Sequence, residues 1–162
     1  MELKILITGG TFDKEYDEIT GELYFKDTHM SEILELGRSK VGVKIEKLML
    51  VDSLDMKKSH RQLILNKCKN SRETQIVITH GTDTMTKTAK IIAKKKIKKT
   101  IVLTGAMIPY KFGSSDGLFN LGGAIAYAQS LPNGVYVAMN GQCFEWDKVE
   151  KNLKTGVFEK IN

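Results

Sequence analysis

Cysteine, proline and long apolar runs are scarce in this sequence of 162 residues. Its two cysteines, Cys68 and Cys143, fall on separate predicted elements without metal-binding or redox spacing, so we expect reduced, buried thiols. Its two prolines, Pro109 and Pro132, lie just outside predicted elements, where a missing N–H does little harm. No apolar run approaches the roughly 20 residues that cross a bilayer. We therefore expect neither disulfide chemistry nor a membrane partner.

Metal-binding and nucleotide-binding patterns are also missing. The histidines His29, His60 and His80 are isolated, and no spacing of His, Cys or carboxylates indicates a metal site. The stretch TGGTF at 8–12 is neither a G-x-G-x-x-G fingerprint nor a P-loop. We therefore expect no metal and no organic cofactor. We interpret His80, at the end of a predicted strand, as hydrogen-bonded structure rather than as a catalytic base.

The formal net charge is +6, but its distribution does not indicate nucleic-acid binding. Much of the excess comes from five lysines near one predicted helix end: Lys94, Lys95, Lys96, Lys98 and Lys99. Lysines there complement the helix dipole and form a solvated surface, and neither interleaved aromatics nor a known binding module accompanies them. A strand-like segment begins at residue 3, which leaves no room for a signal peptide, so we expect a cytoplasmic protein.

Apolar and helical patterns alternate along the chain. Strands are predicted at 3–8, 43–51, 75–79, 100–104 and 134–139, and helices at 30–39, 58–70, 83–96 and 115–131. Several of the strands are nearly continuous in Ile, Leu and Val, which is typical of parallel strands covered on both faces. We predict one domain over residues 1–162, with a doubly wound α/β fold of the Rossmann-like or flavodoxin-like kind, a mainly parallel sheet and helices on both faces.

Hydroxyls and glycines follow the predicted strands. These segments read TGGT at 8–11, DS at 52–53, THGTD at 79–83, TGA at 104–106 and NG at 140–141. Ligands of open parallel sheets bind outside the carboxyl ends of the strands, so we expect a site there. A threonine becomes a useful nucleophile only beside a proton acceptor and fixed N–H donors, and GGT supplies hydroxyl and donors together. Taken alone, Thr82 and Asp83 equally fit helix caps, and Ser53 fits an ordinary loop hydroxyl.

Ordered motifs over most of the chain resemble the bacterial-type L-asparaginases, amidohydrolases that use threonine nucleophiles. TGGTF at 8–12 resembles their first motif, and HGTDTM at 80–85 matches their second. TGAMIP at 104–109 and SSDGLFNL at 114–121 resemble the segments that follow, and VDSLDM at 51–56 resembles the substrate-binding loop. The resemblance implies hydrolysis of L-asparagine, and possible use of L-glutamine, through an acyl-enzyme.

The resemblance also implies catalytic roles. Thr11 would attack the amide and be activated by a tyrosine of the loop that follows, with Tyr16 our first choice and Tyr24 its rival. Thr82 and Asp83 would belong to a second triad. Lys151 would complete that triad by keeping Thr82 basic.

Substrate binding follows from the same resemblance. Ser53 would bind the α-carboxylate and Asp83 the α-ammonium group. The oxyanion would be held by backbone N–H groups beside the two threonines, with Gly10 and Gly81 among the binding residues, and the carbonyl of Ala106 would orient the amide. Leu54 stands where many relatives have a glutamine and cannot replace its side-chain hydrogen bond.

The resembling enzymes carry a second, C-terminal domain that this sequence lacks, so we expect a single N-terminal-type domain that forms a homodimer or homotetramer. Two other functions stay open. One is a binding or regulatory module that holds the amino acid without turnover. The other is an amidase acting on a larger asparaginyl or glutaminyl substrate.

Overall fold

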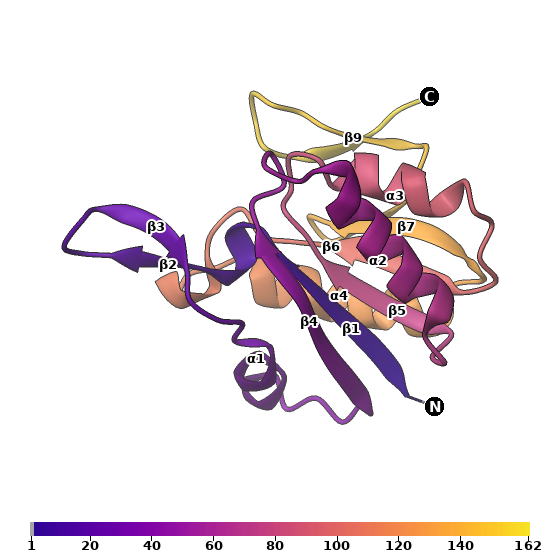
Figure 1. The fold of residues 1–162 in the computed structure, drawn as a ribbon, viewed down its shortest axis with the longest axis horizontal. Coiled ribbons are helices and arrows are strands. Elements are labelled where there is room, and N and C mark those ends of the chain that lie inside the picture. The colour runs from indigo at the N-terminus through magenta and orange to yellow at the C-terminus, as the bar shows by residue number, and fades with distance from the viewer. Residues whose placement is uncertain (1) are drawn as a thin grey trace.

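The computed structural model describes residues 2–162, and within that range a six-stranded sheet forms the centre of an α/β domain (Figure 1). Its parallel strands are, in spatial order, β4 (Val43–Val51), β1 (Leu3–Gly9), β5 (Gln75–Thr79), β6 (Thr100–Thr104) and β7 (Gly134–Met139). An antiparallel strand, β8 (Gln142–Glu145), forms the far edge. The predicted mainly parallel sheet is therefore confirmed.

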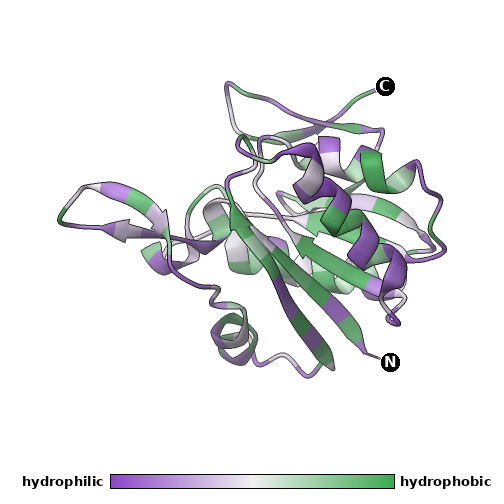
Figure 2. Ribbon diagram, viewed as in Figure 1, coloured by the Kyte–Doolittle hydropathy of each residue, from purple (hydrophilic) through white to green (hydrophobic). Residues whose placement is uncertain are grey.

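Two helices cover each face of this sheet, as expected for a doubly wound fold. Helices α2 (Lys58–Asn70) and α3 (Met85–Ala93) contribute to one buried cluster, and α1 (Met30–Leu36) and α4 (Gly117–Ser130) to the other. Successive apolar side chains of a strand enter opposite clusters, so the central strands are apolar along most of their length, with Lys4 in β1 a charged exception (Figure 2). No helix within residues 2–162 is long and apolar enough to span a membrane.

Two predicted helices end earlier than their patterns indicated, for backbone reasons. The segment 30–39 is helical only to Leu36, because Arg38 adopts a left-handed conformation with φ 52°. The segment 83–96 is helical only over Met85–Ala93, and Lys96 has φ 48°. A non-glycine residue in this region cannot continue a right-handed helix.

Strand order reverses at β1, and this places the expected ligand crevice. The chain first adds β4 on one side of β1 and then adds β5, β6 and β7 on the other. The carboxyl ends of β1 and β5 therefore meet at the topological switch point, where open α/β sheets bind ligands. TGGT follows β1 and HGTD follows β5, so both motifs reach this point.

Two hairpins were not predicted. Strands β2 (Lys14–Asp17) and β3 (Glu22–Phe25) form an arm that projects from the body (Figure 1). Strands β9 (Val149–Lys151) and β10 (Phe158–Lys160) pair over the carboxyl ends of the sheet. All four strands are short, and three of them are rich in charged residues. The sequence pattern of these strands is therefore too weak to predict them.

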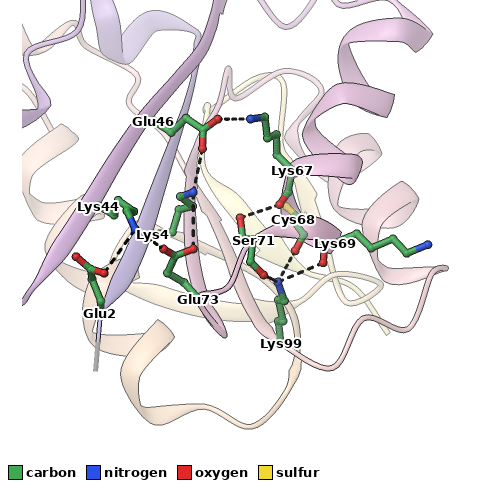
Figure 3. A network of polar contacts seen from close by, with 10 residues as sticks. All are labelled: Glu2, Lys4, Lys44, Glu46, Lys67, Cys68, Lys69, Ser71, Glu73 and Lys99. Atoms are coloured by element: carbon green, nitrogen blue, oxygen red, sulfur yellow. Dashed lines mark hydrogen bonds and ion pairs between the residues drawn. The ribbon is translucent and has the colours of Figure 1, made fainter.

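Lys99 is not the solvated lysine that the sequence indicated. Its residue is 9% exposed, and its ammonium group donates hydrogen bonds to the carbonyls of Cys68 (2.8 Å), Lys69 (3.4 Å) and Ser71 (Figure 3). These carbonyls lie at the end of α2, where backbone oxygens lack helical partners. Lys99 therefore caps a neighbouring helix rather than its own.

Candidate active site

Glycines bring the strand ends into backbone contact. A Cβ on Gly10 would lie within 3.0 Å of the Gly81 backbone, and one on Gly81 would lie within 3.0 Å of the Ser53 side chain. Gly10 also has φ 79°, a conformation that L side chains rarely adopt. Since Thr11 follows Gly10 and Thr82 follows Gly81, each threonine lies one residue from this contact. The loops after β1, β4 and β5 thus converge, as the sequence predicted.

Thr11 begins η1 (Thr11–Asp13), one turn of 3₁₀ helix that is held in place by the burial of its other two residues. Phe12 is 1% exposed and contacts the position where Gly117 begins α4. Asp13 is buried as well, whereas Thr11 is only partly buried. The turn therefore leaves Thr11 partly accessible at the carboxyl end of β1 while its two buried neighbours fix the backbone.

Thr82, Asp83 and Lys151 form a hydrogen-bonded group. The Lys151 ammonium group lies 2.8 Å from Thr82 Oγ1 and 2.6 Å from Asp83 Oδ1. The Lys151 side chain is 10% exposed and comes from β9, which the unpredicted hairpin places over β5. Helix α3 begins at Met85, so neither Thr82 nor Asp83 caps it. A lysine, a hydroxyl and a carboxylate in this arrangement can exchange a proton along one chain.

Ser53 is held by Thr84 rather than left as a loop hydroxyl. The Thr84 N–H donates to Ser53 Oγ (3.2 Å), and the Thr84 hydroxyl donates to the Ser53 carbonyl (2.8 Å). Ser53 is 2% exposed, whereas the neighbouring Leu54 is 71% exposed. Leu54 contributes to the order of the loop only through its backbone. The Leu54 N–H donates to Asp52, which also pairs with Lys14 at 2.6 Å.

Ala106 is fully buried, and two residues missed by sequence reasoning order the segment around it. Asp116 accepts hydrogen bonds from the N–H groups of Met107 and Ile108, each at 3.0 Å. Asn120 donates to the Gly105 carbonyl at 2.9 Å. Both residues fall inside the predicted helix 115–131 and the resembling segment SSDGLFNL, but neither pattern indicates hydrogen bonds back to residues 105–108.

Tyr16 and Tyr24 lie on opposite faces of the β2–β3 arm. Tyr16 pairs with Leu23, and Tyr24 with Glu15, and residues directly paired across antiparallel strands share a face. The Tyr16 hydroxyl lies 3.9 Å from a Cβ built on Gly21, near the turn of the arm. Within residues 2–162, no hydrogen bond joins either tyrosine to Thr11. Neither tyrosine is therefore held by a hydrogen bond in a position to take a proton from Thr11.

His80 is structural, as the sequence indicated. It is fully buried, its Nδ1 lies 2.8 Å from the Gly81 carbonyl, and its Nε2 lies 2.7 Å from the Thr88 hydroxyl. A carbonyl only accepts, so Nδ1 carries the proton and Nε2 accepts from Thr88. Burial lowers the pKa of His80 to about 4, so the ring is neutral near pH 7.

Other candidate groups at the rim are inert. Thr8 and Thr104 are fully buried and donate to the carbonyls of Thr79 and Ala138.

Both cysteines are free thiols, Cys68 buried and Cys143 half-buried, and burial raises their pKa values to about 12 and about 11. Thiolate chemistry is therefore disfavoured. Within residues 2–162, no cluster of His, Cys, Asp and Glu is placed to hold a metal ion.

A doubly wound α/β domain with two threonines, a lysine and a carboxylate at its switch point is the kind of fold and site that amide-hydrolysing enzymes can use. A family model described as "Asparaginase, N-terminal" matches residues 2–160, and the chain belongs to this family.

Curated proteins similar in sequence to this chain include L-asparaginases and an amidotransferase subunit. The chain is 33% identical to a probable periplasmic L-asparaginase of Haemophilus influenzae, over 96% of this chain and 47% of that protein. It is 32% identical to a glutamyl-tRNA(Gln) amidotransferase subunit of Pyrococcus abyssi, over 87% of this chain and 34% of that protein.

Among solved structures, a probable cytoplasmic L-asparaginase of Campylobacter jejuni superposes with a TM-score of 0.83 and 29% identity, covering 98% of this chain and 52% of that one. The chain thus spans about half the length of these asparaginases or less. Because both periplasmic and cytoplasmic proteins match, the cytoplasmic location stays a prediction.

Proposed function

We propose that this chain hydrolyses L-asparagine to L-aspartate and ammonia with Thr11 as nucleophile. The observation that carries the proposal is the contact of Lys151 with both Thr82 (2.8 Å) and Asp83 (2.6 Å). These two residues follow Gly81, whose backbone contacts Gly10, the residue before Thr11. A hydroxyl in such a position needs a proton acceptor, and this group can supply one. Family membership and the α/β fold support the same reaction class.

In the proposed mechanism, the Thr11 hydroxyl oxygen attacks the side-chain amide carbon and its proton leaves to a nearby acceptor, with Tyr16 our candidate once the arm closes. The C–N bond then breaks and a proton passes to the leaving nitrogen, which departs as ammonia. Water then attacks the acyl carbon and gives a proton to Thr82, which passes its own proton to Lys151 in the neutral amine form. The ester C–O bond breaks, the Thr11 oxygen takes back a proton, and L-aspartate leaves. Backbone N–H groups of Thr11 and Thr82 are the proposed oxyanion donors, because the Gly10 N–H already donates to the Val51 carbonyl at 3.1 Å.

Substrate recognition is proposed from the same geometry. Ser53 binds the α-carboxylate and Asp83, whose side chain is 40% exposed, binds the α-ammonium group. The Ala106 carbonyl orients the amide, in a segment fixed by Asp116 and Asn120. Leu54 lines this subsite without contributing a side-chain hydrogen bond.

The proposal is tested by measuring ammonia release from L-asparagine and L-glutamine. We expect Thr11→Ala and Lys151→Met each to lower kcat by at least about 100-fold, because nucleophile and proton acceptor are lost. The matched controls are Thr74→Ala and Lys154→Met, two exposed residues away from these contacts, which should retain wild-type rates. A wild type as inactive as Thr11→Ala on both substrates would refute the catalytic role of Thr11.

A larger substrate is the second candidate. The exposed Leu54 leaves the subsite beside Ser53 without a glutamine's polar contact, and one relative is an amidotransferase subunit named for a tRNA. Turnover of asparaginyl or glutaminyl conjugates, but not of the free amino acids, would select this function. Binding of L-aspartate without any turnover would instead select a regulatory module.

A further inference from the structure

A buried arginine without a counter-charge lies behind the proposed carboxylate subsite. Arg61, in the first turns of α2, is 3% exposed. Its guanidinium donates to the Met56 carbonyl at 2.7 Å and to Thr84 Oγ1 at 2.6 Å, and its Nε has no partner. Within residues 2–162, no Asp or Glu forms an ion pair with it. Burial lowers the pKa of Arg61, yet a guanidinium stays charged at neutral pH.

An unpaired buried charge is costly, so its position calls for a partner that the folded chain does not supply. The nearest acid in sequence to the subsite, Asp52, is already paired with Lys14 at 2.6 Å. Asp55, two residues beyond Ser53, is exposed to solvent. The positive charge of Arg61 is therefore not cancelled from either neighbouring position.

Thr84 connects this charge to Ser53. The Thr84 hydroxyl accepts from Arg61 and so donates its own hydrogen to the Ser53 carbonyl, at 2.8 Å. The Thr84 N–H donates to Ser53 Oγ at 3.2 Å. Because Ser53 Oγ accepts there, its own hydrogen is left to donate, and no acceptor for it is present among residues 2–162. The subsite thus offers a free donor with a buried cation behind it.

We propose that Arg61 is a positioning and specificity residue that makes the Ser53 subsite select substrates with a free, anionic carboxylate. This inference rests on the proposed function and narrows its substrate class to unconjugated amino acids. An α-ester or α-amide keeps the side chain and the ammonium group of the substrate but lacks the negative charge that would meet Arg61. The subsite should reject such conjugates.

The experiment compares two ligands, L-aspartate and its α-methyl ester, by calorimetry on the whole chain. Wild type should bind L-aspartate at least about tenfold more tightly than the ester, as expected for one charge pair near a protein surface. Arg61→Met should weaken L-aspartate binding about tenfold and change ester binding less than about twofold. Arg61→Lys, which keeps the charge, should recover most of the preference. Arg72→Met, the exposed matched control, should bind like wild type.

A purely structural Arg61 would give a different pattern, because a disturbed loop would weaken both ligands equally. That result, or a wild type that binds the two ligands alike, overturns the inference. If Arg61→Met does not fold, Arg61→Gln takes its place: it keeps hydrogen-bond donors but removes the charge, and an unchanged preference for L-aspartate would then overturn the inference. Selective L-aspartate binding without ammonia release would uphold Arg61 while refuting the proposed hydrolysis.

Discussion

Asp13 is a carboxylic acid whose buried environment in the folded chain disfavours the negatively charged form. It is 1% exposed, its Oδ2 has no hydrogen-bond partner, and Asp27 adds like charge nearby. Burial is the main cause that raises the pKa of Asp13 to about 7, although a hydrogen bond with Thr28 opposes the shift. Between the ordinary aspartate pKa of 3.8 and about 7, the folded chain holds a proton here that the unfolded chain has lost.

Asp13 should therefore destabilise the fold as pH rises through that window, by as much as about 4 kcal/mol. We predict that Asp13→Asn, which mimics the neutral acid, is little different from wild type at pH 4 and increasingly more stable up to pH 8. Urea unfolding at several pH values measures this. Asp147→Asn, at an exposed position, is the control. A difference between Asp13→Asn and wild type that does not change with pH would contradict the assignment.

His80 acts in the opposite sense and would mask this behaviour in the wild type. Its pKa falls from 6.5 to about 4 on folding, so the unfolded chain binds the extra proton in that range and stability rises with pH. The two slopes nearly cancel between pH 4 and 6.5. The stability of Asp13→Asn should consequently rise more steeply with pH over this range than that of wild type.

We expect the β2–β3 arm to decide whether Tyr16 or Tyr24 serves Thr11. Tyr16 and Tyr24 occupy opposite faces, so a rotation of the arm toward Thr11 would bring only one of them to it. We predict that Tyr16→Phe lowers kcat at least about 100-fold, because proton transfer from Thr11 is lost, while Tyr24→Phe stays within about threefold of wild type. Steady-state kinetics on L-asparagine measures both. The reverse pattern would assign the role to Tyr24.

Strong, local patterns made most of the sheet predictable from the sequence. Strands such as Gln75–Thr79 and Thr100–Thr104 were predicted to the residue, because a continuous apolar run between glycines and polar loops fits a buried parallel strand. The glycine-rich strand ends likewise located the site. Helix ends were less predictable, since the left-handed turns at Arg38 and Lys96 occur at residues without that preference.

Long-range partners could not be predicted in the same way. Nothing local indicates that Asp116 holds the segment after β6, or that Lys99 caps α2. Lys151 was reached only through family resemblance, because a lysine in a short hairpin ordinarily lies in solvent. Arg61 was missed, since a buried arginine at a helix start has the same local pattern as an exposed one.

At the scale of the whole molecule, apolar side chains lie exposed beside the site. Leu153, 82% exposed, stands in the β9–β10 turn, and Met107, 41% exposed, contacts Gly156 of the same turn. Met107 also lies 3.6 Å from the Thr82 hydroxyl. Exposed apolar groups of this kind next to a crevice favour association.

We therefore predict a homodimer or homotetramer, with a mass that is a multiple of 18.2 kDa in light scattering at micromolar concentration. Leu153→Asp should shift the mass toward 18.2 kDa, whereas Ile19→Asp, at a 90% exposed position on the projecting arm, should not. A wild type that elutes only as the 18.2 kDa species would show that these side chains do not mediate assembly.

Lys151 reaches Thr82 across 69 positions of the chain and from a strand that follows the last strand of the central sheet. A chain emerging from the ribosome would therefore have every sheet strand, both threonines and the serine before its amine was synthesised. The central sheet can therefore be complete while the proposed proton-transfer group still lacks its lysine. Newly made protein gains this group only when the β9–β10 hairpin packs over the sheet.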